Sequence, residues 1–388
     1  MEYQREDVLQ YVREEDVRFI RMAFADPFGR LHNVAVMSDG LLKAFAEGVA
    51  IDASAIPGFP ASETSDLLLF PEPDTFVELP WRPHSGRVGH MFCRICRPDG
   101  TPYEADSRRI LAEAVKRARA QGLAFSFGTE IEFYLFRLDE NGERTDVPFD
   151  RAGYMDVAPE DRGENVRREI CLTLEQMGMH PERSHHESGP GQNEVDFRHA
   201  EPLAAADHAI LFQSVVKNLA AANGLAAVFS PKPLPEEAGS GLHLNVSAVR
   251  EGTPVPPEEL IPGVLAHARE MTAVLNPVPE SYARLGRDKA PGHISWSKEN
   301  RSRLIRVPAA SPDHPRFELR SPDPSANPYL AFALVIEACV EGLGTSCPSA
   351  GEDLGRLPKT LFEARAEARE SRLLMRTLPE EVLALYTR

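Results

Sequence analysis

The segment Gly128–Phe136, with the sequence GTEIEFYLF, constrains the chain more than any other. It alternates as a β-strand does, so Glu130 and Glu132 project from one face while Ile131 and Phe133 project from the other. Two neighbouring carboxylates repel each other, and a fold seldom keeps them on one strand face unless a cation or a proton intervenes. A solvated strand face is the alternative interpretation, and this segment alone leaves both open.

Three further segments carry polar side chains in a similar arrangement. Residues 185–194 (HHESGPGQNE) place two carboxylates and two imidazoles around a glycine–proline turn. Residues 239–247 put a histidine, an asparagine and a serine on one strand face, and residues 316–320 align a glutamate between two arginines. Four amphipathic strands of this kind predict a polar cavity inside a curved sheet, with these side chains in its wall: Glu187, Glu194, His243, Asn245, Ser247 and Glu318.

The chemistry of these side chains indicates a hard metal ion and a phosphate. The ligands are mostly oxygen atoms with one or two imidazoles and no thiolate, a set that favours Mg²⁺ or Mn²⁺ over zinc. Forked guanidinium groups suit phosphate and carboxylate, and arginines accumulate downstream at Arg284, Arg301, Arg303, Arg306, Arg316 and Arg320. A single arginine usually forms a surface ion pair, so the prediction of phosphoryl transfer rests on the whole set.

Other sites and partners are excluded by what the sequence lacks. It contains no GxxxxGK[ST] loop, no complete GxGxxG and no Gly-x-Ser-x-Gly elbow, so neither a P-loop, a Rossmann site nor a serine hydrolase is supported. A net charge of -16 argues against nucleic acid as a partner, because most of the surface would repel a phosphate backbone.

Composition and termini predict a folded cytoplasmic protein that has no membrane partner. No apolar run is long enough to cross a bilayer, and the first residues are acidic where a signal peptide would be basic and then apolar. The five cysteines are scattered, as expected of reduced thiols in the cytosol.

At 388 residues the chain is too long for one ordinary core, so two domains are expected. Strand patterns at 17–26, 31–36 and 88–96 precede a turn at Pro98–Pro102, which marks a candidate boundary. Beyond it strands and helices interleave without a βαβ rhythm, with helices expected from Ser107 to Gly122 and at 164–177, 204–223, 257–275, 328–342 and 359–374. The pattern predicts an α+β fold: a strand-rich small domain, then a large domain whose helices back a curved antiparallel sheet.

In its sequence motifs the chain resembles a glutamine synthetase of the bacterial type, from about residue 17 nearly to its end. The shared motifs keep the family's order, at residues 128–133 (GTEIEF), 185–194, 239–243 (GSGLH), 281–285 (SYARL), 300–302 (NRS), 305–308 (IRVP) and 316–330 (RFELRSPDPSANPYL). The resemblance implies a β-grasp-like domain over residues 1–100 and a catalytic domain over residues 101–388. It also implies a homo-oligomeric ring, a dodecamer of two stacked hexamers, with each active site between the large domain of one subunit and the small domain of its neighbour.

Matched positions imply where substrates and metal ions bind. One metal ion would be held by Glu132, Glu187 and Glu194, and the other by Glu130, His243 and Glu318. Arg284 and the backbone of Gly239 would bind the glutamate end of the substrate, with Arg320 near its reacting carboxyl group. The ATP phosphates would meet Arg301, Arg306 and Arg316, and the remainder of the nucleotide site would include Glu182, Asn245 and Ser247.

The implied reaction has two steps. The glutamate side chain attacks the terminal phosphate of ATP and forms an acyl phosphate, while metal ions and arginines such as Arg301 and Arg320 absorb charge. Ammonia then displaces phosphate. Its site would include Tyr154 and Asp52, the latter lent by the neighbouring subunit, together with a carboxylate of a flap loop.

The flap loop, residues 284–291, departs from the family. The family usually has a glutamate immediately before the Ala-Pro that corresponds to Ala290-Pro291, but this chain has Lys289, and its loop is one residue shorter. A lysine there would repel ammonium by about 1–4 kcal/mol. Three interpretations stay open: the flap is re-registered so that Asp288 takes over, the amine differs, or ligation is impaired.

Three functions therefore compete. The first is glutamine synthesis from glutamate, ammonia and ATP, which the retained Asp52 and Tyr154 favour. The second is a γ-glutamyl ligase for an organic amine or polyamine, which Lys289 and the shortened flap favour. The third is a catalytically weak nucleotide-binding protein, against which all six implied metal ligands argue, since a protein that does not catalyse has no need to retain them.

Overall fold

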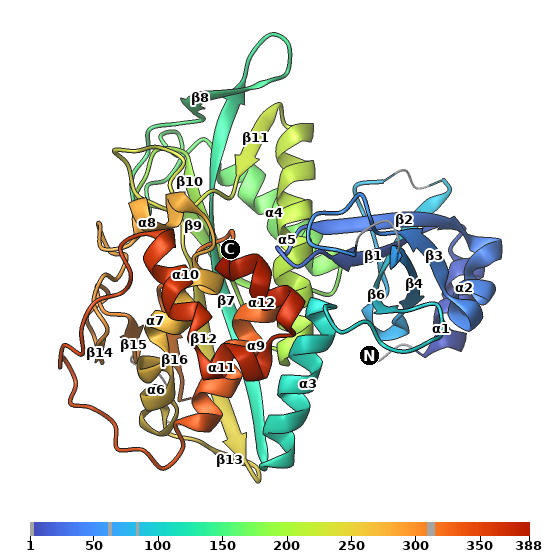
Figure 1. Ribbon diagram of the computed structural model, residues 1–388. Coiled ribbons are helices and arrows are strands. Elements are labelled where there is room, and N and C mark those ends of the chain that lie inside the picture. Colours follow the sequence, from blue (N-terminus) through green and yellow to red (C-terminus); the bar gives the residue numbers. More distant parts are fainter. Residues whose placement is uncertain (1–3, 61–63, 83–84, 309–314) are drawn as a thin grey trace.

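Two sheets organise the part of the chain that the computed structural model describes, residues 4–60, 64–82, 85–308 and 315–388. Within these residues one sheet has six strands and the other has ten (Figure 1). Helices pack on both sheets, and the strands of the larger sheet pair antiparallel except β14 (Trp296–Ser297) with β15 (Ile305–Arg306). The predicted α+β class is confirmed.

The small sheet has the strand order β2-β1-β6-β4-β3, with β5 paired to β6. β1 and β6 run parallel and its other pairs are antiparallel. Ile20 and Met22 of β1 are fully buried while Phe19 is 44% exposed, as the alternation of this segment predicts. The strands are β1 (Val17–Ala25), β2 (Leu31–Met37), β3 (Val49–Asp52), β4 (Asp66–Pro71), β5 (Val77–Glu78) and β6 (Arg87–Cys96), and the helices on this sheet are α1 (Arg5–Glu14) and α2 (Leu41–Glu47).

The large sheet is built around β7 (Leu123–Leu138), a strand of 16 residues. Its main order is β14-β15-β16-β12-β7-β10-β9. Off this path, β8 and β11 pair with β7, and β13 pairs with β12. The remaining strands are β8 (Arg144–Pro148), β9 (Pro181–His186), β10 (Gln192–Phe197), β11 (Leu225–Val228), β12 (Leu242–Arg250), β13 (Thr253–Pro254) and β16 (Phe317–Leu319).

Three long helices cover one face of the large sheet: α3 (Ser107–Ala120), α5 (Pro202–Ala222) and α9 (Pro328–Glu341). Phe127 of β7 stacks on Phe332 of α9 at 4.2 Å, and Phe133 meets Phe212 of α5 at 5.9 Å. Because these rings of β7 bury against helices, the glutamates between them are directed to the opposite face.

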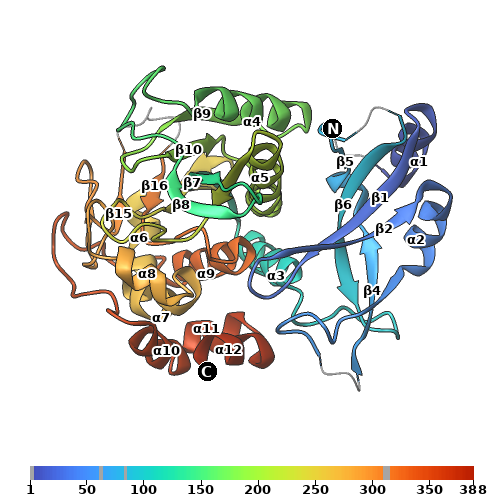
Figure 2. The same cartoon turned by 90° about the horizontal axis from the view of Figure 1, so that it is seen from above.

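Further helices surround this core. Viewed from above, the C-terminal helices form an outer layer beyond α7 and α9 (Figure 2). The predicted helix 257–275 is two helices that divide at His267, and the predicted helix 359–374 ends at Arg369, after which Ser371 caps a new one by accepting a hydrogen bond from the Leu374 N–H at 3.1 Å. These helices are α4 (Glu164–Gln176), α6 (Pro257–Ala266), α7 (Ala268–Leu275), α8 (Pro279–Arg284), α10 (Leu361–Arg369), α11 (Arg372–Thr377) and α12 (Glu380–Thr387).

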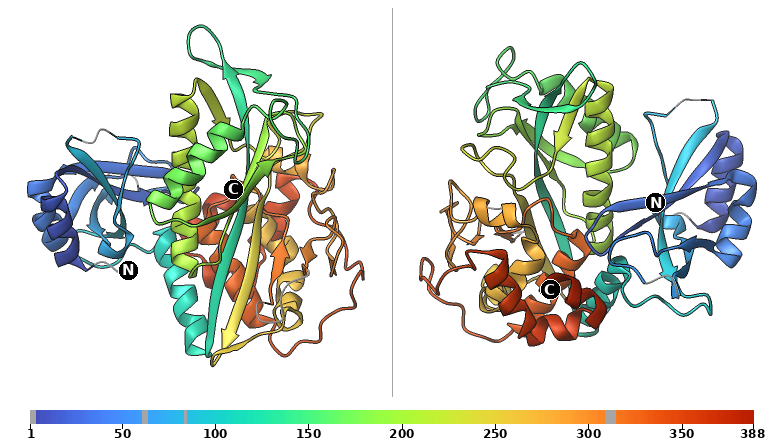
Figure 3. Two further views of the ribbon diagram at one scale, coloured as in Figure 1. Left: turned by 180° about the vertical axis from the view of Figure 1, so that it is seen from behind. Right: turned by 45° about the horizontal axis from the view of Figure 1, so that its top comes forward.

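The small sheet docks on the large domain beside α5, in both views of Figure 3. The turn between β1 and β2 carries the contact: the Asn327 amide donates to the Pro27 carbonyl at 3.0 Å, and the Tyr386 hydroxyl donates to the same oxygen at 2.7 Å. A cavity of about 720 Å³ lies between the two parts, with Arg21, His90 and Lys217 in its wall. In the described part of the chain, no helix combines the length and the apolar character that a membrane span requires.

Candidate active site

Neighbouring strands of the large sheet carry the predicted site residues in rows. β12 pairs with β7 so that His243 lies opposite Glu130, and β10 pairs with β7 so that Glu194 lies opposite Glu132. On the far side of β12, β16 adds Glu318. Directly opposed side chains of an antiparallel pair stand about 5 Å apart, so strand register alone gathers these groups.

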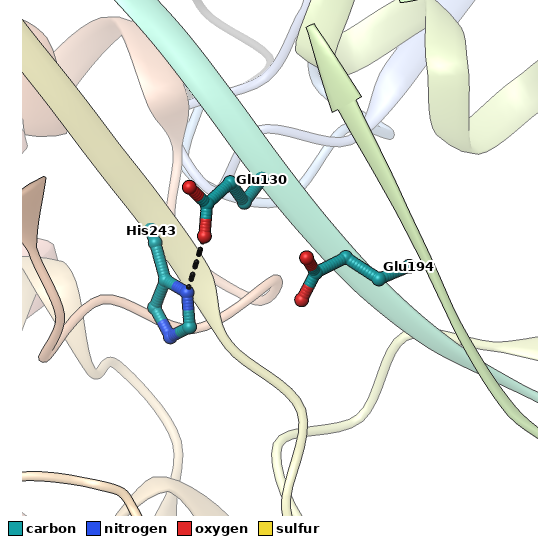
Figure 4. A group of neighbouring side chains, drawn as sticks. All are labelled: Glu130, Glu194 and His243. Carbon is teal, nitrogen blue, oxygen red and sulfur yellow. Dashed lines mark hydrogen bonds and ion pairs between the residues drawn. The ribbon is translucent and has the colours of Figure 1, made fainter. Parts of the chain in front are cut away.

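Glu130, His243 and Glu318 meet as one group, the set that the resemblance implies for one metal ion. The Nδ1 atom of His243 lies 3.2 Å from a Glu130 oxygen and 3.6 Å from a Glu318 oxygen. Figure 4 shows Glu130 on β7 and His243 on β12 pointing toward each other, with Glu194 of β10 nearby. One ligand atom from each of Glu130, Glu194 and His243 lies within 4.8 Å of the other two, a spacing that can accept a metal ion.

Glu132, Glu187 and Glu194 form the second group, and His185 joins it. His185 Nε2 lies 3.3 Å from a Glu194 oxygen, and its Nδ1 lies 4.0 Å from a Glu187 oxygen. Ligand atoms of His185, Glu187 and Glu194 fall within 4.8 Å of one another. Glu132 borders both groups, since one of its oxygens is 3.9 Å from His243 Nε2.

The electrostatics of the cluster fit a divalent cation. Burial, followed by the charge of Glu132, raises the pKa of Glu194 well above its usual range. Burial also raises the pKa of Glu132, and the charge of Glu187 adds to it. Burial acts in the same direction on Glu130, but His243, Asn245 and Arg320 together outweigh it and lower the pKa to about 2. Crowded carboxylates of this kind are costly without a counter-charge, and their oxygens suit Mg²⁺ or Mn²⁺.

Arginines supply the positive charge of the site. Glu318 is fully buried and accepts hydrogen bonds from Arg306 Nε at 2.5 Å and from Arg320 Nη1. Arg320 Nε donates to the Arg301 carbonyl at 2.8 Å, so the two arginines are held together. The three arginines share the wall of a cavity of about 860 Å³ with the other carboxylates, and this wall also includes Arg284 and Arg316. The cavity therefore offers carboxylates for a metal ion and guanidinium groups for an anion.

Gly239 and Arg284 form one edge of this cavity. A side chain at Gly239 would place its Cβ 2.6 Å from the Pro231 carbonyl oxygen and 2.7 Å from Arg284 Cγ, so only glycine fits. The Arg284 guanidinium is buried and donates to the carbonyls of Ser321 at 2.7 Å and Arg320 at 3.1 Å. Arg284 is therefore fixed in place before any ligand arrives.

A second cavity of about 560 Å³ adjoins the cavity of 860 Å³, and the walls of both contain Glu130, Asp196 and Arg316. The residues predicted for the nucleotide meet there: Glu182, Asn245, Ser247 and Arg316. Asn245 links the two cavities, because its amide nitrogen donates to Glu130 at 2.9 Å and its oxygen accepts from Arg316 Nε at 3.2 Å. A ligand that spans both cavities would pass over the carboxylate cluster.

The flap presents Lys289, not Asp288, to Tyr154. The Lys289 ammonium lies 4.6 Å from the centre of the Tyr154 ring. Asp288 has a left-handed backbone with φ of 51°, and its carboxylate lies 3.7 Å from the Lys232 ammonium. Both flap residues line the cavity of 860 Å³, but they face different neighbours.

Asp52 is the predicted site residue that the structure of one chain leaves apart. It is exposed at the end of β3 in the small domain and accepts a hydrogen bond from the Ser54 N–H at 2.9 Å. Hydrogen bonds from Ser54 lower its pKa, which keeps the carboxylate ionised. The walls of the two cavities come from the large domain, and Asp52 is in neither of them.

The cavity residues that were not predicted as site residues include His185, Asp196 and Gln192. Asp196 lies opposite Glu130 and Arg183, and Gln192 Nε2 donates to Glu132 at 3.0 Å and to the Gly239 carbonyl at 3.2 Å. The period-two alternation from Gln192 through Glu194 to Asp196 was the available signal. His186, beside His185, turns away and binds Asp150 at 2.9 Å.

Comparisons with known proteins agree along the whole chain. A family model described as the glutamine synthetase beta-Grasp domain matches residues 16–98, and one described as the glutamine synthetase catalytic domain matches residues 104–388. A glutamine synthetase of Clostridium saccharobutylicum is 40% identical over 99% of this chain and 93% of its own length. One of Methanosarcina mazei is 42% identical over 98% of this chain and 92% of its own length.

Solved structures share the fold. A structure described as a GmaS/ADP complex has a TM-score of 0.88 at 26% identity and covers 98% of this chain and 94% of that chain. The cryoEM structure of Plasmodium falciparum glutamine synthetase has the same TM-score of 0.88 at 20% identity, which supports the fold alone. On the family models and the two relatives, the chain belongs to the glutamine synthetase family.

Proposed function

We propose that this chain is an ATP-dependent ligase that joins ammonia to the γ-carboxyl group of glutamate through an acyl phosphate. One observation supports the proposal: ligand atoms of Glu130, Glu194 and His243, and those of His185, Glu187 and Glu194, lie within 4.8 Å of one another beside an arginine-lined cavity that adjoins a second cavity. Glu130, Glu132, Glu187, Glu194, His243 and Glu318 would hold Mg²⁺ or Mn²⁺, which when bound supplies positive charge to the ATP phosphates.

In the first step a carboxylate oxygen of glutamate forms a bond to the terminal phosphorus of ATP, and the bond from that phosphorus to the bridging oxygen breaks, releasing ADP. Arg284 and the Gly239 backbone hold the amino-acid end, while Glu182, Asn245 and Ser247 hold the nucleotide. Arg301, Arg306, Arg316 and Arg320 offset the negative charge that builds on the transferred group.

In the second step the lone pair of ammonia attacks the acyl carbon, and the bond from that carbon to the phosphate oxygen breaks. The attacking nitrogen loses a proton, which leaves with inorganic phosphate. Ammonium must first lose a proton, and Asp52 of a neighbouring subunit, kept ionised by its hydrogen bonds, accepts it. Tyr154 provides the ring face on which a cationic amine can rest.

The proposal also covers the domain bounds, the assembly and the location of the protein. We propose domains at residues 1–100 and 101–388, a ring of two stacked hexamers, and a cytoplasmic location. The absence of Asp52 from the walls of both cavities supports a ring, because the site role that the resemblance gives this residue then needs a second subunit.

The experiment is a phosphate-release assay with glutamate, ATP and Mg²⁺, run with ammonium, methylammonium, ethylamine and a diamine. We expect ammonium to give the highest kcat/KM. A preference for an organic amine would transfer the assignment to a γ-glutamyl ligase, which the position of Lys289 over Tyr154 favours as the second candidate. Negligible release with every amine, while ATP still binds in calorimetry, would leave a nucleotide-binding protein without ligase activity.

A further inference from the structure

The Lys289 ammonium occupies the aromatic surface that the proposed function assigns to the amine. It stands 4.6 Å from the centre of the Tyr154 ring, within the range of a cation–π contact. In the described part of the chain, the Lys289 ammonium contacts this ring and forms no ion pair with a carboxylate. The flap therefore places a cation of the chain where a cationic substrate would lie.

The surroundings of Tyr154 suit a cation. The ring of His185 meets the Tyr154 ring edge-on at 5.4 Å, and Glu187 and Glu194 line the same cavity. An aromatic face beside carboxylates attracts an ammonium group whether it belongs to a substrate or to a side chain. The Lys289 ammonium and a substrate ammonium cannot both lie on this ring face, because two positive charges on one ring face repel each other.

The loop cannot exchange Asp288 for Lys289 at this position without changing its backbone. Asp288 is held in the left-handed region at φ 51° and is directed toward Lys232, whose side chain is 5% exposed and donates to the Glu237 carbonyl. The Asp288 side chain is 59% exposed, so this pair adds only a modest preference to that of the backbone. The flap therefore holds its lysine, and not its aspartate, over the ring in this structure.

We propose that Lys289 is a specificity-determining residue that competes with the cationic amine for the ring face of Tyr154 and thereby raises the KM of this chain for ammonium. The proposal rests on the proposed function, since it needs an amine to arrive at Tyr154. Ammonium binds only in the fraction of molecules in which the Lys289 side chain has left the ring, and its apparent affinity falls by that fraction.

The size of the effect follows from the exposure of both groups. Tyr154 is 46% exposed and Lys289 is exposed, and a cation–π contact at an exposed site shifts an equilibrium about two- to five-fold. Removing the lysine should lower the KM for ammonium by about that factor, and an acidic residue in its place should lower it further.

The test compares KM for ammonium and KM for glutamate in Lys289→Gln, Lys289→Glu and Lys289→Arg with the unmodified chain. We expect the KM for ammonium to fall in the order Arg, Gln, Glu, with Arg close to the unmodified chain because guanidinium also stacks on an aromatic ring. The KM for glutamate should stay within about two-fold, because Arg284 and Gly239 hold that substrate. Lys298→Gln, which removes an exposed lysine paired with Glu258 at 4.0 Å, is the matched control and should change neither constant.

Failure of the inference and failure of the function give different results. An unchanged KM for ammonium in both Lys289→Gln and Lys289→Glu, with phosphate release intact, overturns the role of Lys289 alone. Equal changes in the constants for ammonium and glutamate indicate a structural role for the flap and overturn it too. Absence of phosphate release in every variant, including the unmodified chain, overturns the proposed function and the inference with it.

Discussion

At the residue scale, several carboxylates of the site have hydrogen-bond donors of the same chain beside them. Glu318 is closed between Arg306 and Arg320, and Glu130 is held by His243 and Asn245. At Glu194, burial and the charges of neighbouring carboxylates raise the pKa although His185 lies 3.3 Å away. The pKa shifts differ because the balance between burial, neighbouring carboxylates and hydrogen-bond donors differs from one carboxylate to the next.

The Glu130→Gln variant tests the metal assignment. The amide keeps the size of the carboxylate but lacks its charge, so the apparent affinity for Mg²⁺ should fall by at least about 10–100-fold. Magnesium titration by calorimetry, and the Mg²⁺ dependence of phosphate release, would measure it. Glu143→Gln, at an exposed hairpin position, should leave both unchanged, and equal Mg²⁺ affinity in the two variants would exclude Glu130 as a ligand.

The buried histidine of the small domain predicts a pH effect on stability. Burial, with a further contribution from Arg21, lowers the pKa of His90 from 6.5 to about 3. Below pH 6.5 His90 binds a proton in the unfolded chain but stays neutral in the folded chain. The folded state therefore loses stability as the pH falls from 6.5 toward 3. At pH 6.0 the loss is about 1 kcal/mol relative to neutral pH.

The measurement for His90 is urea unfolding at pH 7.5 and pH 6.0, compared with His90→Gln. Only the difference between the two pH values matters, because the substitution also changes packing. The unmodified chain should lose about 1 kcal/mol more than the variant over this interval. Parallel losses in the two proteins would mean that His90 is protonated in the folded state as readily as in the unfolded one.

Sequence alternation was sufficient to identify the cavity-facing side of the strands, including Glu130, Glu132 and His243. It could not show what Lys289 contacts, because that depends on a loop backbone with Asp288 at positive φ and on Tyr154, more than a hundred residues away. Contacts of this kind depend on the three-dimensional path of loops, which no local pattern encodes.

At the element scale, two helices of the large domain approach so closely that only glycine fits between them. A Cβ built on Gly263 of α6 would lie 1.8 Å from the Ala338 carbonyl oxygen of α9, and 2.9 Å from the Gly342 nitrogen. Both atoms belong to backbone and cannot move aside as a flexible side chain would. The helix pair behind the sheet therefore depends on the absence of one methyl group.

Gly263→Ala should destabilise the chain by about 3 kcal/mol, the upper part of the range for overpacked cores. Gly40→Ala is the matched control, because its φ is -81° and nothing lies within 4 Å of the added Cβ. That control should change stability by less than about 1 kcal/mol. Thermal unfolding of the two variants measures the contrast, and similar midpoints would contradict the close crossing of α6 and α9.

Helix existence was predictable at this scale, but helix division was not. The sequence predicts one helix across 257–275 and another across 359–374, because each keeps apolar residues at helical spacing. The structure divides the first at His267 and the second before Ser371, whose hydroxyl caps a new helix. A serine within a helical pattern is compatible with either outcome, and tertiary packing decides between them.

At the scale of the whole molecule, the turn between β1 and β2 offers its backbone carbonyls to side chains of the large domain. Asn327 and Tyr386 donate to the turn at Pro27, and a side chain at Gly29 would lie 2.9 Å from Asn327 Cα. Sequence motifs indicated that two domains exist, but nothing in them showed that Asn327 at the start of α9 would hold the small domain. Such a contact joins residues 300 positions apart, beyond the reach of periodicity.

The position of Asp52 makes a prediction about the assembly. If a neighbouring subunit supplies Asp52, then Asp52→Asn and Glu130→Gln damage different halves of one shared site. Each variant alone should be almost inactive. A ring assembled from both should contain some sites with an intact Asp52 from one subunit and an intact Glu130 from the next.

For random mixing in equal amounts, about a quarter of the sites are intact, since each half is intact with a chance of about one half. Unfolding and refolding the two variants together should therefore restore about a quarter of the specific activity of the unmodified protein, whereas refolding them separately and then mixing should restore none. A single chain that used its own Asp52 would remain inactive after both treatments, because no subunit would carry both residues. Recovery after joint refolding alone thus requires that the small domain of one subunit completes the site on the large sheet of another.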